Sequence, residues 1–260
     1  MRSVTPYSYQ KRGKYALTYV KARCYFFTMA QKTAGMSEHI AAIPLFEGLS
    51  GEQYDELARI GVDRSYKGGQ IIFTEGDEGT GFYVLISGKV KVFKLSPEGK
   101  EQILHVFGEG EPFGEASVFA GQRFPAHAEA LEESRIFFFP RAPFIELVKE
   151  DPSLSLNMLA ILSRRLRKFT VLVEDLSLKE VPGRLAAYLL YVSEQRGGND
   201  DLTLDIAKNQ LASLLGTIPE TLSRILTRMV RQGLIQLDGP RIRILDRQGL
   251  EELAGAERRL

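Results

Sequence analysis

Glu220, Ser223 and Arg224 lie three and four residues apart, so a helix would place them on one face. An arginine can donate two hydrogen bonds to guanine O6 and N7, a glutamate can accept one from a cytosine amine, and a serine can bond a base or a phosphate. The spacing therefore predicts contact with DNA base edges. The alternatives are that Glu220 only complements a helix dipole and that Arg224 is only a solvated surface residue.

A helix that begins at Pro219 would present these side chains opposite a buried stripe. Proline suits a first helical turn because its φ angle is already helical. The stripe consists of Leu222, Ile225, Leu226, Met229 and Val230. A shorter amphipathic helix is predicted over 205–215, and Gly216 fits a tight turn that needs a positive φ. We therefore expect a helix-turn-helix whose second helix enters the major groove with its N-terminal end.

A hairpin is predicted directly after this motif. Residues 233–237 and 241–245 alternate around Asp238-Gly239, a dipeptide typical of tight hairpin turns. We interpret the hairpin as a wing. Basic and hydroxyl side chains on the motif and the wing are expected to contact DNA phosphates. These residues are Lys208, Thr217, Arg228, Arg241 and Arg243.

The chain before position 143 has a different pattern. Between Val62 and Pro140, short apolar runs alternate with period two and are separated by glycine turns, which predicts an antiparallel jelly-roll β-barrel. The predicted class is α+β. Its parts are a basic N-terminal extension over 1–36 without ordered structure, an effector-sensing barrel over 37–148, a dimerisation helix over 149–180 and a winged helix-turn-helix over 181–260.

Apolar residues recur at spacings of three and four along the long helix, as in a coiled-coil seam. They are Leu159, Leu162, Leu166, Phe169, Val173 and Leu176. The seam continues beyond the barrel, which favours a homodimer over a core helix of a monomer.

Composition narrows the classes of function. The 260 residues are 26% charged with a net charge of +1, and the only cysteine is Cys24. One thiol cannot hold an iron–sulfur cluster of four thiolates, so such a cluster is not expected. Lys21 and Arg23 interrupt the most apolar early stretch, so we expect a cytoplasmic protein without membrane contact. No catalytic motif is recognisable, and the protein is not expected to be an enzyme.

Taken together, these motifs resemble the Crp/Fnr superfamily of bacterial regulators. The resemblance lies in four segments, which are 73–77, 82–92, 113–115 and 219–224. It implies a homodimer that binds palindromic DNA and contacts RNA polymerase. The run Glu220-Thr221-Leu222-Ser223-Arg224 is similar to Fnr-type proteins and implies TTGA-like half-sites. With Ile218-Pro219 before it, the run is similar to the nitric-oxide-responsive branches, namely the denitrification regulators and the regulators of hybrid-cluster protein genes.

The resemblance also implies an effector pocket in the barrel. In cyclic-nucleotide-binding relatives a Gly-Glu pair binds the ribose and a downstream Arg-Ser-Ala run binds the phosphate. Gly114 and Glu115 match the first motif. The second reads Phe124-Pro125-Ala126, with Arg123 one residue early and so on the other strand face. The positions that carry Thr-Ser in cyclic-AMP receptors read Phe169-Thr170. Cyclic AMP is therefore disfavoured.

Haem is the effector group that the nitric-oxide-responsive branches suggest. It requires an apolar cavity and an axial ligand. Candidate ligands are His105 and His127, with Met158 as a weaker one, and the candidate lining is Phe107, Phe113, Phe119 and Phe169. Two alternatives remain open, namely a cyclic-nucleotide-responsive regulator and a regulatory module of a partner enzyme.

Overall fold

The computed structural model describes residues 36–150 and 152–255. The predicted basic extension therefore lies outside the described residues, apart from Met36. Residues 36–41 are helical, and Met36 and Ile40 are buried in the core beside the barrel. Position 36 thus belongs to the folded domain and not to the extension. No helix within the described ranges is long and apolar enough to cross a membrane.

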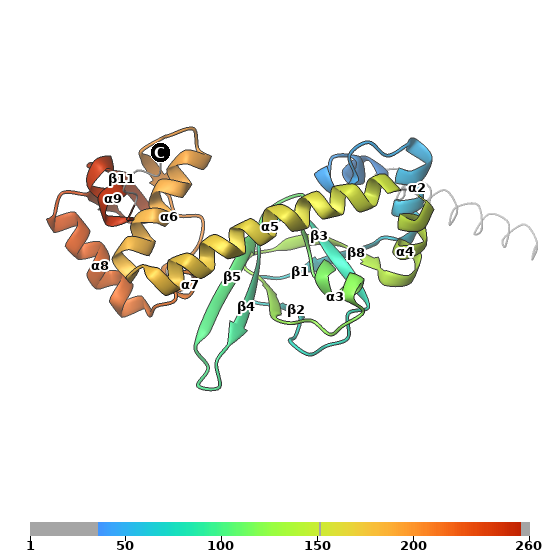
Figure 1. The fold of residues 1–260 in the computed structure, drawn as a ribbon, viewed down its shortest axis with the longest axis horizontal. Helices are drawn as coiled ribbons and strands as arrows, with labels where there is room; N and C mark the ends of the chain where they lie inside the picture. Colours follow the sequence, from blue (N-terminus) through green and yellow to red (C-terminus); the bar gives the residue numbers. More distant parts are fainter. Residues whose placement is uncertain (1–35, 151, 256–260) are drawn as a thin grey trace, which may run out of the picture.

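Strands between Val62 and Pro140 form two four-stranded antiparallel sheets, which confirms the jelly-roll prediction (Figure 1). In order across the first sheet the strands are β1 (Val62–Tyr66), β8 (Ser134–Pro140), β3 (Gly81–Ser87) and β6 (Pro112–Phe113). Across the second they are β2 (Ile71–Phe73), β7 (His127–Ala130), β4 (Val90–Leu95) and β5 (Glu101–Phe107). The sequence did not predict β1, β6 and β7. Strand β1 has only one buried residue, β6 has only two residues, and the buried positions of β7 are alanines.

Short helices flank the sheets. They are η1 (Pro44–Phe46), α2 (Gly51–Ile60), α3 (Glu115–Ala120) and α4 (Arg141–Glu150). Helix α2 begins with a capping box in which the Ser50 hydroxyl accepts from the Gln53 amide and the Gln53 side chain accepts from the Ser50 amide. Two apolar cores result. One lies between the first sheet and the helices, and the other lies inside the barrel.

Helix α5 (Pro152–Leu178) runs from the barrel to the C-terminal unit (Figure 1). It is the predicted dimerisation helix, although residues 149 and 150 end α4 instead. Its first part is anchored, because Leu154 and Met158 are buried in the barrel-side core. Helix α6 (Val181–Gln195) begins three residues after α5 ends, where the sequence predicted the start of the C-terminal unit.

The C-terminal unit is a winged helix-turn-helix. After α6 come β9 (Asp201–Thr203), α7 (Lys208–Leu214), α8 (Pro219–Arg231), β10 (Ile235–Asp238), β11 (Arg241–Ile244) and α9 (Arg247–Leu253). The predicted hairpin is β10–β11, and β9 adds a third strand beside β11 that the sequence did not predict.

Two details of the helix-turn-helix differ from the prediction. Helix α7 begins at Lys208 and not at Asp205, because the Asp205 carboxylate accepts hydrogen bonds from Arg196 and the Gln210 side chain accepts from the Ala207 amide. Val230, predicted to be buried, is 40% exposed near the end of α8.

Candidate nucleic-acid interface and effector pocket

The two faces of α8 have opposite character. Leu222, Ile225, Leu226 and Met229 are buried in the core of the C-terminal unit. Glu220, Ser223 and Arg224, the predicted base-contacting residues, are all exposed near the N-terminal end. The helix begins with Ile218 as its N-cap, which makes no side-chain cap hydrogen bond, and Pro219 follows as predicted. The apolar face therefore packs α8 against the core, while its polar face is exposed to solvent.

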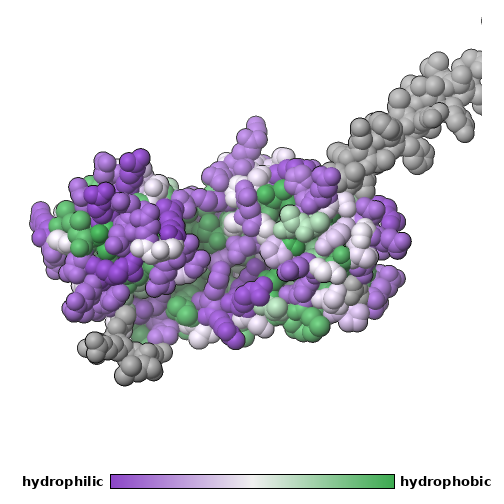
Figure 2. All heavy atoms as spheres, turned by 90° about the horizontal axis from the view of Figure 1, so that it is seen from above, coloured by the Kyte–Doolittle hydropathy of each residue, from purple (hydrophilic) through white to green (hydrophobic). Residues whose placement is uncertain are grey.

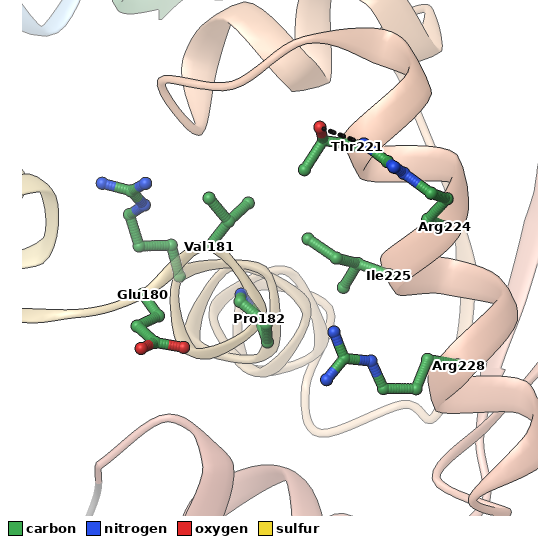
Figure 3. A pocket seen from close by; sticks show the side chains of 8 residues that line it. Glu180, Val181, Pro182, Thr221, Arg224, Ile225 and Arg228 are labelled. Atoms are coloured by element: carbon green, nitrogen blue, oxygen red, sulfur yellow. Dashed lines mark hydrogen bonds between the residues drawn. The ribbon is translucent and has the colours of Figure 1, made fainter.

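Thr221 is a residue of this surface that the sequence did not single out. Its hydroxyl accepts a hydrogen bond of 3.2 Å from Nη2 of Arg224 one turn later (Figure 3). Both side chains line a pocket of about 550 Å³ between α8 and the first turn of α6, together with Glu180, Pro182 and Arg228 among others. The contact between Thr221 and Arg224 could have been expected from the sequence, because residues three positions apart on a helix are neighbours.

The predicted phosphate-contacting residues lie in three settings. Lys208, Arg228 and Arg241 are exposed. Thr217 lies in the turn and its amide donates to the Ala212 carbonyl. Arg243 is different, because its guanidinium forms two hydrogen bonds to the Asp201 carboxylate on β9, at 2.6 and 3.2 Å. These bonds lower the pKa of Asp201 and raise that of Arg243. Arg243 of the wing is thus already paired with a residue of β9.

Three of the predicted effector-pocket residues do come together. Gly114 has φ +77° and precedes α3, whose first residue is Glu115. The ring of Phe124 lies over this turn, where a Cβ on Gly114 would be 3.1 Å from Phe124 Cε1. Phe124 is also stacked on Phe73 with ring centroids 3.9 Å apart. Aromatic side chains therefore fill the space in front of the Gly-Glu pair.

Arg165 of α5 completes this cluster and was missed by the sequence analysis. Its guanidinium is paired with the Glu115 carboxylate, and its Nη2 donates to the Pro112 carbonyl at 2.6 Å. It also lies over the Phe107 ring, 4.9 Å from the centroid. Glu115 is only 2% exposed. One buried ion pair therefore ties the long helix to the pocket.

The other predicted pocket residues do not join this cluster as a group. Ala126 is buried, but Pro125 is exposed and its carbonyl accepts from Lys94. Phe169 is 37% exposed on α5. The Thr170 hydroxyl, on the same helix, donates to the Leu166 carbonyl one turn earlier. Gly114, Glu115 and Phe124 thus lie together, whereas the other predicted pocket residues do not join them.

The predicted haem ligands are engaged with carboxylates. His127 Nδ1 accepts from the Glu75 amide at 3.2 Å, and its Nε2 is 3.8 Å from Glu75 Oε2. His105 Nε2 is 3.7 Å from Glu111 Oε2. Burial alone would raise the pKa of Glu111, but His105, the Gly108 amide and Lys168 together lower it to about 2.

The predicted haem lining is also divided between two cores. Phe107 and Phe113 pack together inside the barrel, with ring centroids 5.4 Å apart. The ring of Phe119 instead lies beside that of Phe144 of α4, with centroids 6.3 Å apart. Phe144 and Met158 belong to the core between the first sheet and the helices. These residues do not form one cavity with a free axial ligand. The residues present therefore do not fit haem.

The predicted seam on α5 is largely exposed. Leu159, Leu166 and Val173 are 59%, 68% and 63% exposed at intervals of seven residues. Leu162 instead packs against the barrel-side core, and Leu176 contacts the turn at Gly216. Hydrophobic side chains are visible on a mainly hydrophilic surface in both halves of the molecule (Figure 2). Exposure of three large apolar side chains on one helix indicates a face that another chain covers.

Comparison with known proteins agrees with this architecture. Residues 63–151 match the cyclic nucleotide-binding domain and residues 183–253 the Crp-like helix-turn-helix domain. The chain is 34% identical over 211 residues to the cyclic AMP receptor protein of Thermus thermophilus, covering 81% of this chain and 96% of the relative. It is 30% identical over 223 residues to the CRP-like cAMP-activated global transcriptional regulator of Mycobacterium tuberculosis, covering 84% and 100%.

A solved structure shares the fold. FixK2 from Bradyrhizobium japonicum has a TM-score of 0.66 at 24% identity, covering 75% of this chain and 97% of that one. A barrel joined by one long helix to a winged helix-turn-helix defines a class of DNA-binding transcription regulators. The chain belongs to the Crp/Fnr family of that class.

Proposed function

We propose that the protein is an effector-controlled homodimer that binds palindromic DNA with TTGA-like half-sites. Arg224 contacts the guanine, Glu220 the opposite strand and Ser223 a thymine. The observation that supports this proposal is the exposure of all three side chains on one face of a helix whose other face is buried. The types of these side chains match the donors and acceptors of the major groove.

The proposed dimer forms through the exposed seam residues of α5. Two half-sites one helical turn apart, about 34 Å, require two recognition helices held at that separation. Lys208, Arg228 and Arg241 supply phosphate contacts that fix the register of each unit on the duplex. RNA polymerase is the proposed protein partner of the DNA-bound dimer.

Replacing Arg224 with alanine is expected to weaken binding to a TTGA palindrome by about 1–3 kcal/mol, because one bidentate base contact is lost. Binding to a duplex with the guanine replaced should change little, so the specificity ratio falls. Fluorescence anisotropy with both duplexes at one salt concentration measures this ratio. Arg228→Ala is the control variant, since loss of a phosphate contact should weaken both complexes alike and reduce the salt slope by about one.

Two results would contradict the proposal. One is wild-type protein that binds the palindrome no better than the altered duplex. The other is an Arg224→Ala variant that keeps the wild-type specificity ratio. A protein that instead regulates a partner enzyme would keep its activity in the Arg224→Ala variant.

The second candidate function is that of a cyclic-nucleotide-responsive regulator, which the names of the two relatives favour. Phe124 and Arg165 occupy the surroundings of Glu115, and we therefore expect no heat of cyclic AMP binding in titration calorimetry up to about 1 mM ligand. The double variant Phe124→Ala, Arg165→Ala tests whether these side chains are the obstacle. Saturable binding of cyclic AMP to the wild type would establish the second candidate.

Nitric oxide sensing through haem is the remaining candidate for the signal. We propose no role for haem, because the rings of His105 and His127 lie beside the carboxylates of Glu111 and Glu75. The DNA-binding part of the proposal is independent of which effector acts on the barrel.

A further inference from the structure

The barrel and the helix-turn-helix are joined by side chains that reach backbone carbonyls. Lys89 Nζ donates to the Asp205 carbonyl at 3.0 Å. Gln102 Nε2 donates to the Leu214 carbonyl at 3.3 Å, and Lys100 Nζ to the Gly216 carbonyl at 3.4 Å. We call these three bonds the barrel contacts. They place α7 beside β5 (Figure 1).

Two of the three acceptors lie at the C-terminal end of α7, where backbone carbonyls have no partner within the helix. Leu214 is the last residue of α7, and the last four carbonyls of an α-helix have no intrahelical partner. The Gly216 carbonyl lies in the turn that follows, and Lys100 places a positive charge close to this helix end, where it is favourable. Side chains of the barrel therefore donate hydrogen bonds to backbone carbonyls that would otherwise bond to water.

Gly216 is confined for two separate reasons. Its φ of +67° favours glycine, as the sequence predicted. In addition, a Cβ at this position would lie 2.9 Å from Leu176 Cδ2 and 3.0 Å from Gln102 Oε1. The turn between α7 and α8 thus sits directly against α5 and β5. The packing leaves no space for even a methyl group unless these side chains move.

The barrel contacts hold the motif without covering its base-contacting face. Glu220, Ser223 and Arg224 remain exposed while the turn is held. We propose that the barrel contacts fix the helix-turn-helix on α5 in the orientation that binds DNA. This inference rests on the proposed function, because a palindrome requires two recognition helices at a fixed separation. A C-terminal unit that is free to rotate about the junction between α5 and α6 binds DNA less tightly, because binding must then restrict that rotation.

Strand β5 also connects these contacts to the barrel interior. Gln102 lies on this strand, and so does Phe107, which is buried and contacts both Phe113 and Arg165. A change in the packing of the interior that shifts β5 would therefore reach the turn at Gly216 directly. Gln102 and Phe107 are five positions apart on this one strand.

The test is the double variant Lys100→Ala, Gln102→Ala in the full-length protein. We expect binding to the TTGA palindrome to weaken about tenfold, as two hydrogen bonds between the units are lost. Lys94→Ala is the matched control, because this lysine lies on the same hairpin but contacts Glu75 and the Pro125 carbonyl within the barrel. Light scattering and urea unfolding establish that each variant is dimeric and folded.

The salt dependence of binding distinguishes orientation from direct contact with DNA. If Lys100 fixes the orientation, the slope of log Kd against log salt is unchanged in the double variant. A slope reduced by about one would mean that Lys100 neutralises a phosphate, and that result overturns the inference. Wild-type affinity in the double variant also overturns it. So does tighter binding, since the contacts would then restrain the motif in an inactive position.

Hydrogen exchange gives a readout that does not depend on DNA. Amides over 208–217 should exchange faster in the double variant than in the wild type or in Lys94→Ala. Unchanged exchange overturns the inference. If the wild type fails to prefer the palindrome while exchange responds as expected, the proposed function fails and the structural role of the barrel contacts stands.

Discussion

Replacing Arg165 with alanine is expected to lower the free energy of unfolding by about 3–5 kcal/mol, the range for a buried ion pair that loses one partner. The remaining Glu115 carboxylate is 2% exposed, and its Oε2 has no hydrogen-bond partner among the described residues even when Arg165 is present. Without the guanidinium it must be buried with an uncompensated charge or take up a proton. Urea unfolding followed by circular dichroism measures the loss.

The double variant Arg165→Met, Glu115→Gln separates the charge from the packing. It removes both ions and keeps similar side-chain volumes, and buried ion pairs can be replaced in this way at little cost. We expect it to recover most of the stability that Arg165→Ala loses. A single variant that unfolds at the wild-type urea concentration would show that the ion pair has no role in stability.

Replacing Leu166 with glutamate is expected to separate the proposed dimer into monomers. The residue is 68% exposed and is the middle member of the stripe formed with Leu159 and Val173. The substitution places one unpaired carboxylate in the seam of each chain, where apolar side chains pack. Light scattering at micromolar concentration should give the mass of one chain. Palindrome binding should fall by about 10²–10⁴, because the two units no longer bind as one.

Ala160→Glu is the matched control for this prediction. It adds the same charge at an exposed position of the same helix, one residue beyond Leu159 and outside the seam. We expect this variant to remain dimeric and to keep its affinity for DNA. A Leu166→Glu protein that still has the mass of two chains would place the dimer interface on another surface.

The recognition helix was predictable because local pattern and chemistry agree there. Pro219 begins the helix, an apolar stripe buries one side, and Gly216 has the positive φ that the turn requires. The jelly roll could likewise be predicted from the alternation of apolar residues between glycine turns. Each of these features follows from patterns among residues that are near neighbours in the sequence.

The interior of the barrel was less predictable because its contacts join distant segments. Arg165 and Glu115 are 50 positions apart and meet only after α5 has packed across the sheets. Similarly, no local pattern shows that Asp201 pairs with Arg243 or that His127 contacts Glu75. The residues proposed for haem lie apart for this reason. The haem hypothesis grouped side chains by type, whereas the fold distributes them between separate cores.

The stacking of Phe124 on Phe73 sets a concentration threshold for any small molecule that enters the barrel at the Gly-Glu turn. An aromatic pair contributes about 0.5–1.5 kcal/mol beyond its buried area, and a ligand that separates the two rings must offset this amount. Its apparent dissociation constant rises by a factor of about 2–13 for that reason alone. A substitution at position 124 would thus change this dissociation constant through the ring stack, without any change in the residues proposed to contact DNA.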